Sequence, residues 1–473
     1  MRAMHDGVSG ARDEQRAADW SIGLDFGTAF SKAAGAKIMP TEDATLRAVR
    51  PLRIGAAAGS SRPYLVPSSL FLDRERVHFG SRAIKLLIGA NLEDRELVRS
   101  FKRVLGADDY EDALNRYPRP TVDPDRVFTL GDLIVLYLAY LLALVEATAP
   151  EAFGDPRAMQ AARVRFTRPG WIPNRIAAAH EVMTRLFNQA HAVHKILRDT
   201  LLNPHGVEYA TARAALDSAR DNPTFPSLDG GIYEASAVGL CHYSDSKTPN
   251  YLLIIDVGAG TTDAAALMRA PFGNEICIVR AGRRTIEVAG DHFDAAFIEL
   301  LVAKAKLKSD EDRTALRNRV MPVVRELKEQ LFLNGIVRLT FRGQRINCTA
   351  QELERRASFK SALGEINRLY ETCLAELIEA GRRQGVNNIG IVLAGGGANL
   401  PALRNAIMKR RWNGFGMRIT HVPDTPAWVS ALGRGHDYAP LFSQMSAAFG
   451  AAISAPERND ASDPPEAVRT LRV

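Results

Sequence analysis

The sequence has few cysteines and no apolar run of membrane-spanning length. Four cysteines, Cys241, Cys277, Cys348 and Cys373, show neither paired nor zinc-like spacing. They predict no disulfide framework and no zinc site, so a reducing cytoplasm fits best. The most apolar helical stretch, 133–145, lies between Asp132 and Glu146 and is shorter than the ~20 residues that cross a bilayer. We therefore expect a buried crossover helix and no membrane partner.

Composition and charge indicate a globular chain rather than a nucleic-acid-binding one. The 473 residues are 46% hydrophobic and 24% charged, which suits two to four compact units. The formal charge of +7 slightly favours acidic partners, of which ATP is one. Basic clusters are more often solvated helix faces than nucleic-acid sites, so a nucleic-acid partner is not expected. The first residues have no apolar core, which excludes a secretory signal.

One stretch, 251–267 (YLLIIDVGAGTTDAAAL), has the composition of a phosphate loop. An apolar run ends at Asp256, and small or hydroxyl residues follow it up to Asp263. This order predicts a buried strand, a tight turn and a second strand. The small residues let successive N–H groups point at one phosphate, and two carboxylates beside a triphosphate suit a magnesium ion. The candidate binding residues of the turn are Gly258, Ala259, Gly260, Thr261 and Thr262.

Two common nucleotide motifs do not fit this turn. A Walker loop needs a Lys and a Ser or Thr after its last Gly, and a dinucleotide fingerprint needs a small residue where Asp263 stands. From this stretch alone, an ordinary Gly-rich hairpin remains the alternative.

The same pattern occurs a second time, in residues 21–31 (SIGLDFGTAFS). Apolar residues end at Asp25, and Gly27, Thr28 and Ala29 follow. Two copies in one chain suggest a duplicated domain that holds a nucleotide between two lobes.

A third glycine-rich stretch, 389–407 (IGIVLAGGGANLPALRNAI), predicts a strand followed by a helix. Asn399 suits the N-cap of that helix and Pro401 its first turn. The consecutive glycines, Gly395, Gly396 and Gly397, let a flat ring or a phosphate approach bare backbone.

These three stretches, in this order, resemble the actin-like ATPase superfamily. Further stretches are similar to the nucleotide-binding domain of DnaK-type heat-shock chaperones, which we take as the closest relative. They are SFKRVLG at 100–106, YEASAVGL at 233–240, VAGDHFDAAF at 288–297 and SAAFGAAI at 446–453. The resemblance implies an α/β chain with a duplicated ribonuclease-H-like fold, two lobes and a central nucleotide cleft.

The resemblance also implies roles for particular residues. Asp25 and Asp256 would orient magnesium through its waters, and Asp263 and Glu234 would position the attacking water. Lys85 is the nearest match to the family's catalytic lysine, and Lys102 is expected to be structural. Lys328, Gly395, Gly396, Gly397 and Asn399 would contact the nucleoside. ATP or ADP and Mg²⁺ are the implied ligands.

The expected domain boundaries follow the two copies. Residues 20–248 would form the first lobe, with a surface insertion at about 190–229, and 249–455 the second lobe with a closing helix. Residues 1–19 and 456–473 are expected to be disordered tails. The peptide-gripping domain of the chaperones has no counterpart in this sequence.

The resulting functional prediction is a chaperone-like ATPase switch whose lobes move with nucleotide state and whose protein partners depend on that state. A filament-forming actin-like ATPase would share every phosphate motif, and a non-hydrolysing nucleotide sensor is a third hypothesis. A sugar kinase is less favoured, because no separate sugar-binding signature is present.

Overall fold

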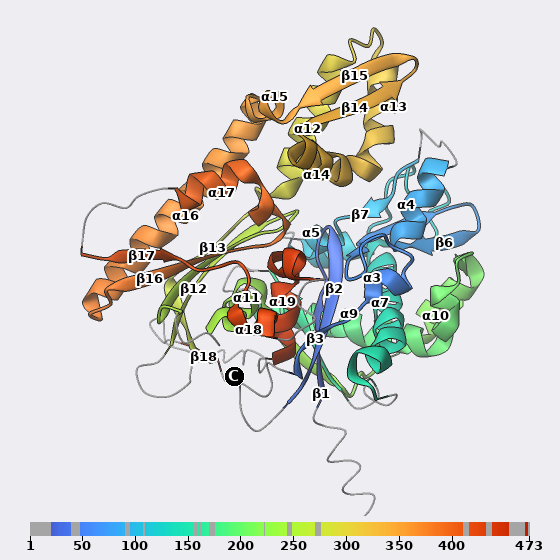
Figure 1. The fold of residues 1–473 in the computed structure, drawn as a ribbon. Helices are drawn as coiled ribbons and strands as arrows, with labels where there is room; N and C mark the ends of the chain where they lie inside the picture. Colours follow the sequence, from blue (N-terminus) through green and yellow to red (C-terminus); the bar gives the residue numbers. More distant parts are fainter. Residues whose placement is uncertain are drawn as a thin grey trace, which may run out of the picture.

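The computed structural model describes residues 20–38, 48–89, 95–106, 109–155, 159, 162–169, 176–221, 223–243, 248–269, 276–409, 416–431, 438–453 and 469–471. Its described part is an α/β fold built around two sheets of like topology (Figure 1). In each sheet two antiparallel strands form a hairpin. The first strand of the hairpin also pairs with a parallel strand on its other side, and that strand pairs with a second parallel strand. The predicted duplicated fold is confirmed.

The first sheet has the strand order β10, β8, β1, β2, β3, and β4 also pairs with β2. Strands β1 and β8 are parallel, and β1 and β2 form the hairpin that carries the first aspartate loop. The bounds are β1 Trp20–Asp25, β2 Phe30–Lys37, β3 Arg50–Pro51, β4 Val66–Pro67, β8 Arg163–Arg168 and β10 Leu228–Tyr233.

The second sheet has the order β17, β16, β11, β12, β13, β18. Strand β11 is buried on both faces: Leu253 and Ile255 pack in one cluster and Leu252 and Ile254 in another, which explains its unbroken apolar run. The bounds are β11 Tyr251–Val257, β12 Thr262–Arg269, β13 Ile276–Ile286, β16 Asn388–Ala394, β17 Arg418–His421 and β18 Arg469–Leu471.

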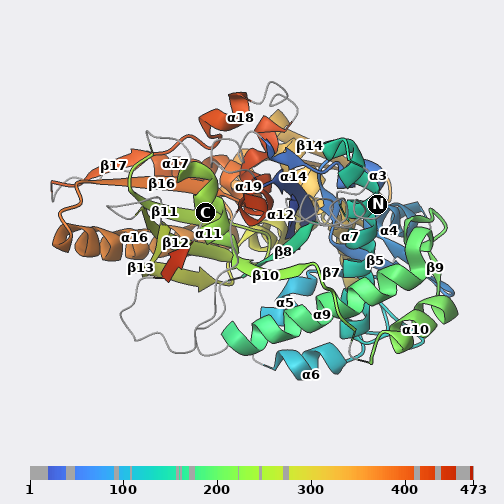
Figure 2. The same cartoon turned by 90° about the horizontal axis from the view of Figure 1, so that it is seen from below.

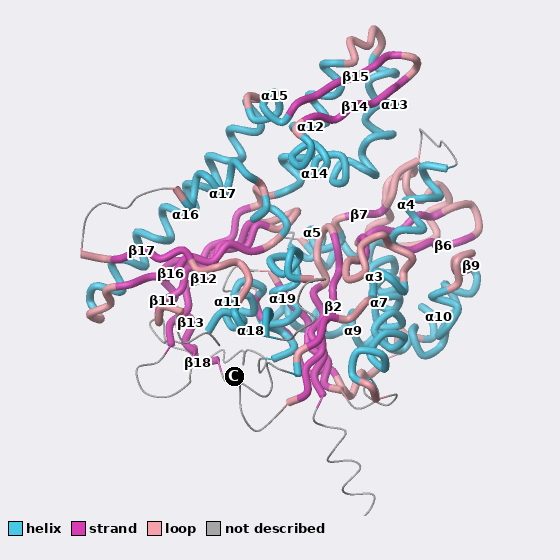
Figure 3. The backbone as a smooth tube through the Cα atoms, viewed as in Figure 1, coloured by secondary structure: helices cyan, strands magenta, loops and turns pink. Residues whose placement is uncertain are grey.

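Each half carries a smaller outer part. In the first half, α4 lies on a four-stranded sheet of order β7, β5, β6, β9, and in the second the β14–β15 hairpin lies over α12 to α14 (Figure 3). Their bounds are α4 Gly80–Gly89, β5 Ser69–Leu72, β6 Arg76–Phe79, β7 Val98–Arg99, β9 Val207–Glu208, α12 Gly290–Lys304, α13 Asp310–Val320, η3 Met321–Val323, α14 Val324–Asn334, β14 Ile336–Phe341, β15 Gln344–Thr349 and α15 Ala350–Glu354.

Helices cover both faces of each main sheet. In the largest buried cluster, α7 and α9 pack on the first sheet. In a separate cluster, α16 packs on the second sheet. The bounds are α3 Ile54–Ala57, α5 Phe101–Gly106, α6 Tyr110–Asn115, α7 Leu130–Phe153, α9 Ile176–Leu197, η2 Arg198–Leu202, α10 Tyr209–Ser218, α11 Glu234–Tyr243, α16 Ala357–Arg383, η4 Gly396–Asn399, α17 Pro401–Met408, α18 Ala427–Ala431, η5 Ala439–Leu441 and α19 Phe442–Ile453.

Two helices, α11 and α19, lie between the main sheets (Figures 1 and 2). Small residues make their close contacts possible. A Cβ on Gly450 would lie 1.9 Å from the carbonyl oxygen of Ala237, and one on Gly23 would lie 2.2 Å from that of Ala448. The closing helix α19 therefore packs against α11 and the first sheet, and its Ala447 and Ala451 also lie in a buried cluster with strands β11, β12 and β16 of the second half. We propose that the lobes divide near residue 248, with α19 as the element that both share.

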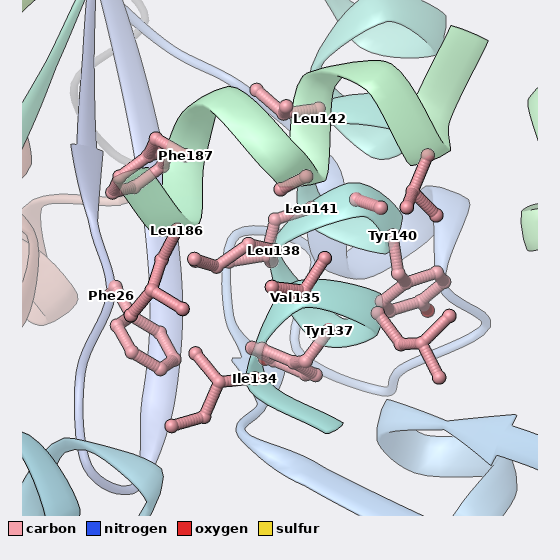
Figure 4. Packing of buried hydrophobic residues seen from close by; sticks show 14 of the residues in the cluster. Phe26, Ile134, Val135, Tyr137, Leu138, Tyr140, Leu141, Leu142, Leu186 and Phe187 are labelled. Carbon is pink, nitrogen blue, oxygen red and sulfur yellow. The ribbon is translucent and has the colours of Figure 1, made fainter. Parts of the chain in front are cut away.

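Helix α7 is the crossover helix that the sequence predicts, but it is longer. Its 24 residues continue past Asp132 and Glu146, and Thr129 caps its N-terminus through a capping box with Asp132. It is the one helix in the described part that is long and apolar enough to cross a membrane, and 72% of its most apolar window is buried inside the protein. Its apolar faces pack against α9 and Phe26 (Figure 4).

Three expectations concern the stretch 190–229 and the two ends of the chain. The stretch 190–229 contains the end of α9 and all of α10, and Ala190, Val193 and Leu216 lie in the main core, so it is part of the lobe rather than a surface insertion. Within the expected tail 456–473, Arg469–Leu471 pairs with β13 as an edge strand. Residues 1–19 lie outside the described residues. All four cysteines are described and buried, and none of them forms a disulfide bond.

Candidate active site

A cavity of about 660 Å³ lies between the two halves and brings together most of the predicted site residues. Its wall includes both aspartate turns, the triple-glycine turn, α14 and the start of α19. The predicted residues that line it are Asp25, Gly27, Thr28, Ala29, Glu234, Asp256, Gly258, Ala259, Thr261, Lys328, Gly395, Gly396, Gly397 and Asn399.

The two aspartate hairpins have the same geometry and opposite charge on their second strands. In β1–β2, Asp25 pairs across the hairpin with Lys32. In β11–β12, Asp256 pairs in the same way with Asp263. The equivalent position therefore carries a cation in one lobe and an anion in the other.

Asp25 is buried and held by two side chains. Lys32 Nζ lies 2.6 Å from its Oδ2, and Thr167 Oγ1 donates to its Oδ1 at 2.9 Å. Burial acts to raise the pKa of this carboxyl, but the charges of Lys32 and Lys102 together with the hydrogen bonds from Lys32 and Thr167 hold the pKa below its ordinary value. Asp25 is therefore ionised at neutral pH.

Lys102, expected to be structural, reaches the same place from α5. Its ammonium pairs with Glu234, and Thr167 Oγ1 also contacts Glu234 Oε1 at 3.3 Å. Burial lowers the pKa of Lys102 to about 8, against the opposing effect of Asp25 and Asp263. The site thus contains a buried lysine whose pKa is lowered but which still carries its charge at neutral pH.

An aromatic cluster fixes both Asp25 and Lys102. Phe26, which follows Asp25, lies 6.2 Å from Phe101, which precedes Lys102, and both rings lie against Tyr137 of α7. Figure 4 shows Phe26 beside Tyr137 in the core under the turn. Packing of apolar neighbours thus sets the positions of the two charged side chains.

Asp256 faces the least favourable charge environment in the site. Burial raises its pKa to about 7, and the negative charges of Asp263 and Asp25 add to this, while Lys32 and Lys102 oppose it. The Gly395 backbone has φ 78°, and a Cβ there would lie 2.4 Å from Asp256 Oδ1. Only glycine fits this contact without strain.

Asp263 lies behind the wall rather than in it. Its carboxylate accepts hydrogen bonds from Thr285 Oγ1 at 2.6 Å on Oδ1 and from Thr261 Oγ1 at 2.9 Å on Oδ2. It is not among the residues that line the cavity.

The second turn is held from behind by the start of α12. Gly290 N donates to Gly258 O at 3.1 Å, and Asp291 N donates to Ala259 O at 2.8 Å. Thr262 directs its hydroxyl to Val288 O at 2.6 Å, so this side chain fixes the turn. Neither Thr262 nor Gly260 lines the cavity.

On the α14 side, the cation expected to meet the nucleoside is part of an ion-pair cluster. Lys328 Nζ lies 2.5 Å from Asp294 Oδ1, and Arg325 bonds Asp291 at 2.9 Å. These pairs join α14 to α12. Opposite them, Gly396 has open space where a Cβ would be, and Asn399 approaches Ser443 at 3.5 Å.

One ion pair crosses the mouth of the cavity. Arg62, from the first half, donates through Nη1 to Glu329 Oε1 of α14 at 3.1 Å and through Nη2 to Oε2. Its guanidinium lies 5.0 Å from the centre of the Phe30 ring. A bidentate pair of this kind is directional, so it links the outer parts of the two halves.

The predicted catalytic lysine, Lys85, lies elsewhere. Its side chain is exposed, and its Nζ donates to Gly59 O at 3.2 Å. Lys102 and Lys32 instead supply the positive charge beside the carboxylates. The sequence contains a signal for Lys32, which follows Asp25 at the same spacing as Asp263 follows Asp256. Lys102 lies in the stretch SFKRVLG, which resembles a segment of the chaperone domain, but its contact with Glu234 comes from tertiary packing and not from that local pattern.

The charges in the site suit a divalent cation bound through water. Four carboxylates, Asp25, Asp256, Asp263 and Glu234, stand against two ammonium groups. Within the described residues no group of three or more His, Cys, Asp or Glu side chains is close enough to ligate a metal directly. The excess of carboxylate and the raised pKa of Asp256 fit Mg²⁺, which keeps several of its waters.

Two like-folded halves with an aspartate hairpin from each in a shared cavity define an actin-like ATPase. The sequence model of the MreB/Mbl protein family matches residues 164–439 of the 473. The chain belongs to the MreB/Mbl family. The match includes Glu234, Asp256 and Asp263, whereas Asp25 and Lys102 precede it and are placed by the geometry alone. It supports the superfamily assignment and gives no support to a closer relation with DnaK-type chaperones.

We expect Asp256→Asn to change the pH dependence of stability. A carboxyl whose pKa is raised on folding binds its proton more tightly in the folded state, so it lowers stability as the pH rises from about 4 to 7. We compare the free energy of unfolding of the variant with that of the wild type, without nucleotide or divalent cation. At pH 8 the difference should favour the variant by up to about 4 kcal/mol more than it does at pH 4. Urea unfolding across this range tests it, and parallel curves would contradict it.

Reversing the charges of the cross-cavity pair should change nucleotide release. We expect Arg62→Glu and Glu329→Arg each to speed the release of a fluorescent ATP analogue by up to about fivefold, the effect of a partly exposed pair. The double variant should restore the rate because the pair is re-formed with opposite polarity. Arg76→Glu is the control, since its partner Glu208 lies in the same half. A double variant as fast as the single variants would exclude the link.

Proposed function

We propose that this chain binds ATP with magnesium in the central cavity, hydrolyses it, and assembles with further copies of itself in a nucleotide-dependent manner. The observation that supports nucleotide binding most is the convergence of Asp25 and Asp256, one from each half, on a single cavity. Membership of the MreB/Mbl family supports assembly, because that family consists of actin-like, filament-forming ATPases.

In this proposal the turns of the two hairpins bind the phosphates. Gly27, Thr28, Gly258 and Ala259 border the cavity with backbone groups and short side chains, which can approach an anion closely. Bound magnesium would neutralise negative charge on the phosphates, and Asp25 and Asp256 would hold it through its waters. A bare triphosphate would be repelled by the excess of carboxylate, so nucleotide binding should require the cation.

Lys102 and Glu234 are the residues that we assign to proton and charge control. In the present structure they neutralise each other. An arriving phosphate competes with Glu234 for the Lys102 ammonium. Glu234 then becomes free to orient the attacking water and accept its proton. Asp263, held behind Asp256, would orient the same water and balance the charge of Lys102.

A chaperone-like switch is the second candidate. The buried Lys102 beside Asp25 and Glu234 favours it, because a lysine next to the phosphates is what the resemblance to heat-shock chaperones implies. Such a protein would move its lobes with nucleotide state, bind protein partners according to that state and remain in the cytoplasm without assembling. A non-hydrolysing sensor is the third candidate, and measured turnover would exclude it.

Comparing two lysine variants tests the reassigned catalytic charge. We expect Lys102→Met to lower kcat for ATP by about 10²-fold, the usual scale for a positioned catalytic group. Lys85→Met should leave it unchanged, because Lys85 lies outside the cavity. Phosphate release measures the rate, and thermal unfolding checks that both variants fold. Equal rates for Lys102→Met and the wild type would refute the assignment.

Assembly is tested by sedimentation and electron microscopy. With Mg²⁺-ATP, we expect the protein to pellet and to form filaments above a critical concentration, because head-to-tail contacts that do not close into a ring extend without limit. With ADP or without nucleotide the pelleted fraction should fall. A protein that stays monomeric at high concentration while it hydrolyses ATP would favour the chaperone-like switch instead.

A further inference from the structure

Asp263 is unusually constrained for a residue that does not itself border the cavity. It is buried, and hydrogen bonds from two hydroxyl groups reach both of its carboxylate oxygens. One of these, from Thr261, comes from the phosphate turn itself. The other, from Thr285, comes from the neighbouring strand β13, and no sequence motif indicates it.

An irregularity in β13 brings Thr285 to this position. The register of the pairing between β12 and β13 shifts between Ala264 and Ala266. On the Asp263 side of this shift, Asp263 pairs directly with Thr285. Gly282, with φ 85°, lies in the extra segment, and Glu376 of α16 accepts a hydrogen bond from its N–H at 3.1 Å. Bulges often redirect a side chain beside a functional site. Here the bulge is held in place by a helix on the outer face of the sheet.

A third hydroxyl group also contacts Asp263. Tyr233, at the end of β10, has its hydroxyl 3.4 Å from Asp263 Oδ1 and 3.2 Å from Ala264 O. The Arg283 guanidinium lies 4.5 Å from the centre of its ring. Burial raises the pKa of Tyr233 well above its ordinary value, so its hydroxyl stays protonated and donates.

Tyr233 also precedes Glu234 in the chain. Glu234 contacts Thr167, whose hydroxyl donates to Asp25. Two consecutive residues thus contact different hairpins. Glu234 is linked through Thr167 to Asp25 of the β1–β2 hairpin. Tyr233 contacts Asp263 of the β11–β12 hairpin, as Thr285 does. The end of β10 is therefore a common support for the carboxylates of both halves.

We propose that Thr285, backed by Tyr233, is a positioning residue for ATP hydrolysis: its hydroxyl fixes the orientation of the Asp263 carboxylate relative to Glu234. This inference rests on the proposed role of Asp263 in orienting the attacking water. Thr285 does not line the cavity, so it acts on the reaction through Asp263 and not on the bound nucleotide.

Removing the hydroxyl should therefore lower kcat without changing KM. We expect Thr285→Val to lower kcat by about tenfold, the result of losing one well-aligned hydrogen bond at the catalytic step. Thr285→Ser should keep most of the wild-type kcat, because it retains the donor. Tyr233→Phe should have a smaller effect in the same direction, since its contact with Asp263 is longer.

The control is a matched change in the same sheet. Thr420 of β17 donates its hydroxyl to Asn388 Oδ1 at 2.8 Å, away from the cavity, so Thr420→Val removes the same kind of hydrogen bond and should leave kcat unchanged. If Thr285→Val lowers the Tm more than the control does, Thr285→Ala replaces it.

Asp263→Asn separates this inference from the function on which it rests. A wild-type rate in Asp263→Asn would show that the proposed role of Asp263 is wrong. A slow Asp263→Asn with a wild-type kcat in Thr285→Val would leave that role intact and overturn the positioning by Thr285. A rise in KM with Thr285→Val, or no rescue by serine, would assign Thr285 a purely structural role and also overturn the proposal.

Discussion

The structure depends on holding four carboxylates, three of them buried and that of Glu234 partly buried, beside only two lysines at the point where its halves meet. Burial, together with the repulsion between like charges in a low-dielectric site, raises the pKa of Asp256 to about 7. The rest of the fold keeps these groups in place in spite of the repulsion. Aromatic packing fixes Asp25 and Lys102, the α12 start supports the second turn, and Gly395 admits the Asp256 carboxylate. An unfavourable local arrangement is thus maintained by the surrounding core, as is common at functional sites.

Much of this arrangement is predictable from local sequence pattern. An apolar run that ends in Asp-x-Gly specifies a strand and a tight turn, and its repetition specifies the duplicated fold. The three glycines before α17 likewise predict the turn that borders the cavity. These features depend on residues that are close together in the sequence, so the local pattern is enough to predict them.

What the sequence could not show comes from contacts between distant segments. Lys102 reaches Glu234 because Phe101 packs under Phe26, and no spacing rule links α5 to β1. Thr285 meets Asp263 because of a bulge whose register cannot be read from composition. The stretch 190–229 looks like an insertion by length, yet its apolar residues complete the core around α7. The phosphate motifs are shared across the superfamily and do not separate its members. The shorter stretches at 100–106, 233–240, 288–297 and 446–453 favoured the chaperones, whereas the match over 164–439 identifies the MreB/Mbl family.

The packing of α11 and α19 on each other and on the second sheet limits how the two halves can move. Backbone lies against backbone at Gly450 and Ala237, with no room for one more carbon atom, so we infer that neither helix can slide along the other. Pivoting about this contact remains available, and a small change of angle there becomes a large displacement at the far ends of the molecule. The Arg62–Glu329 pair spans that distant opening, where even slight rotation would pull its two partners apart.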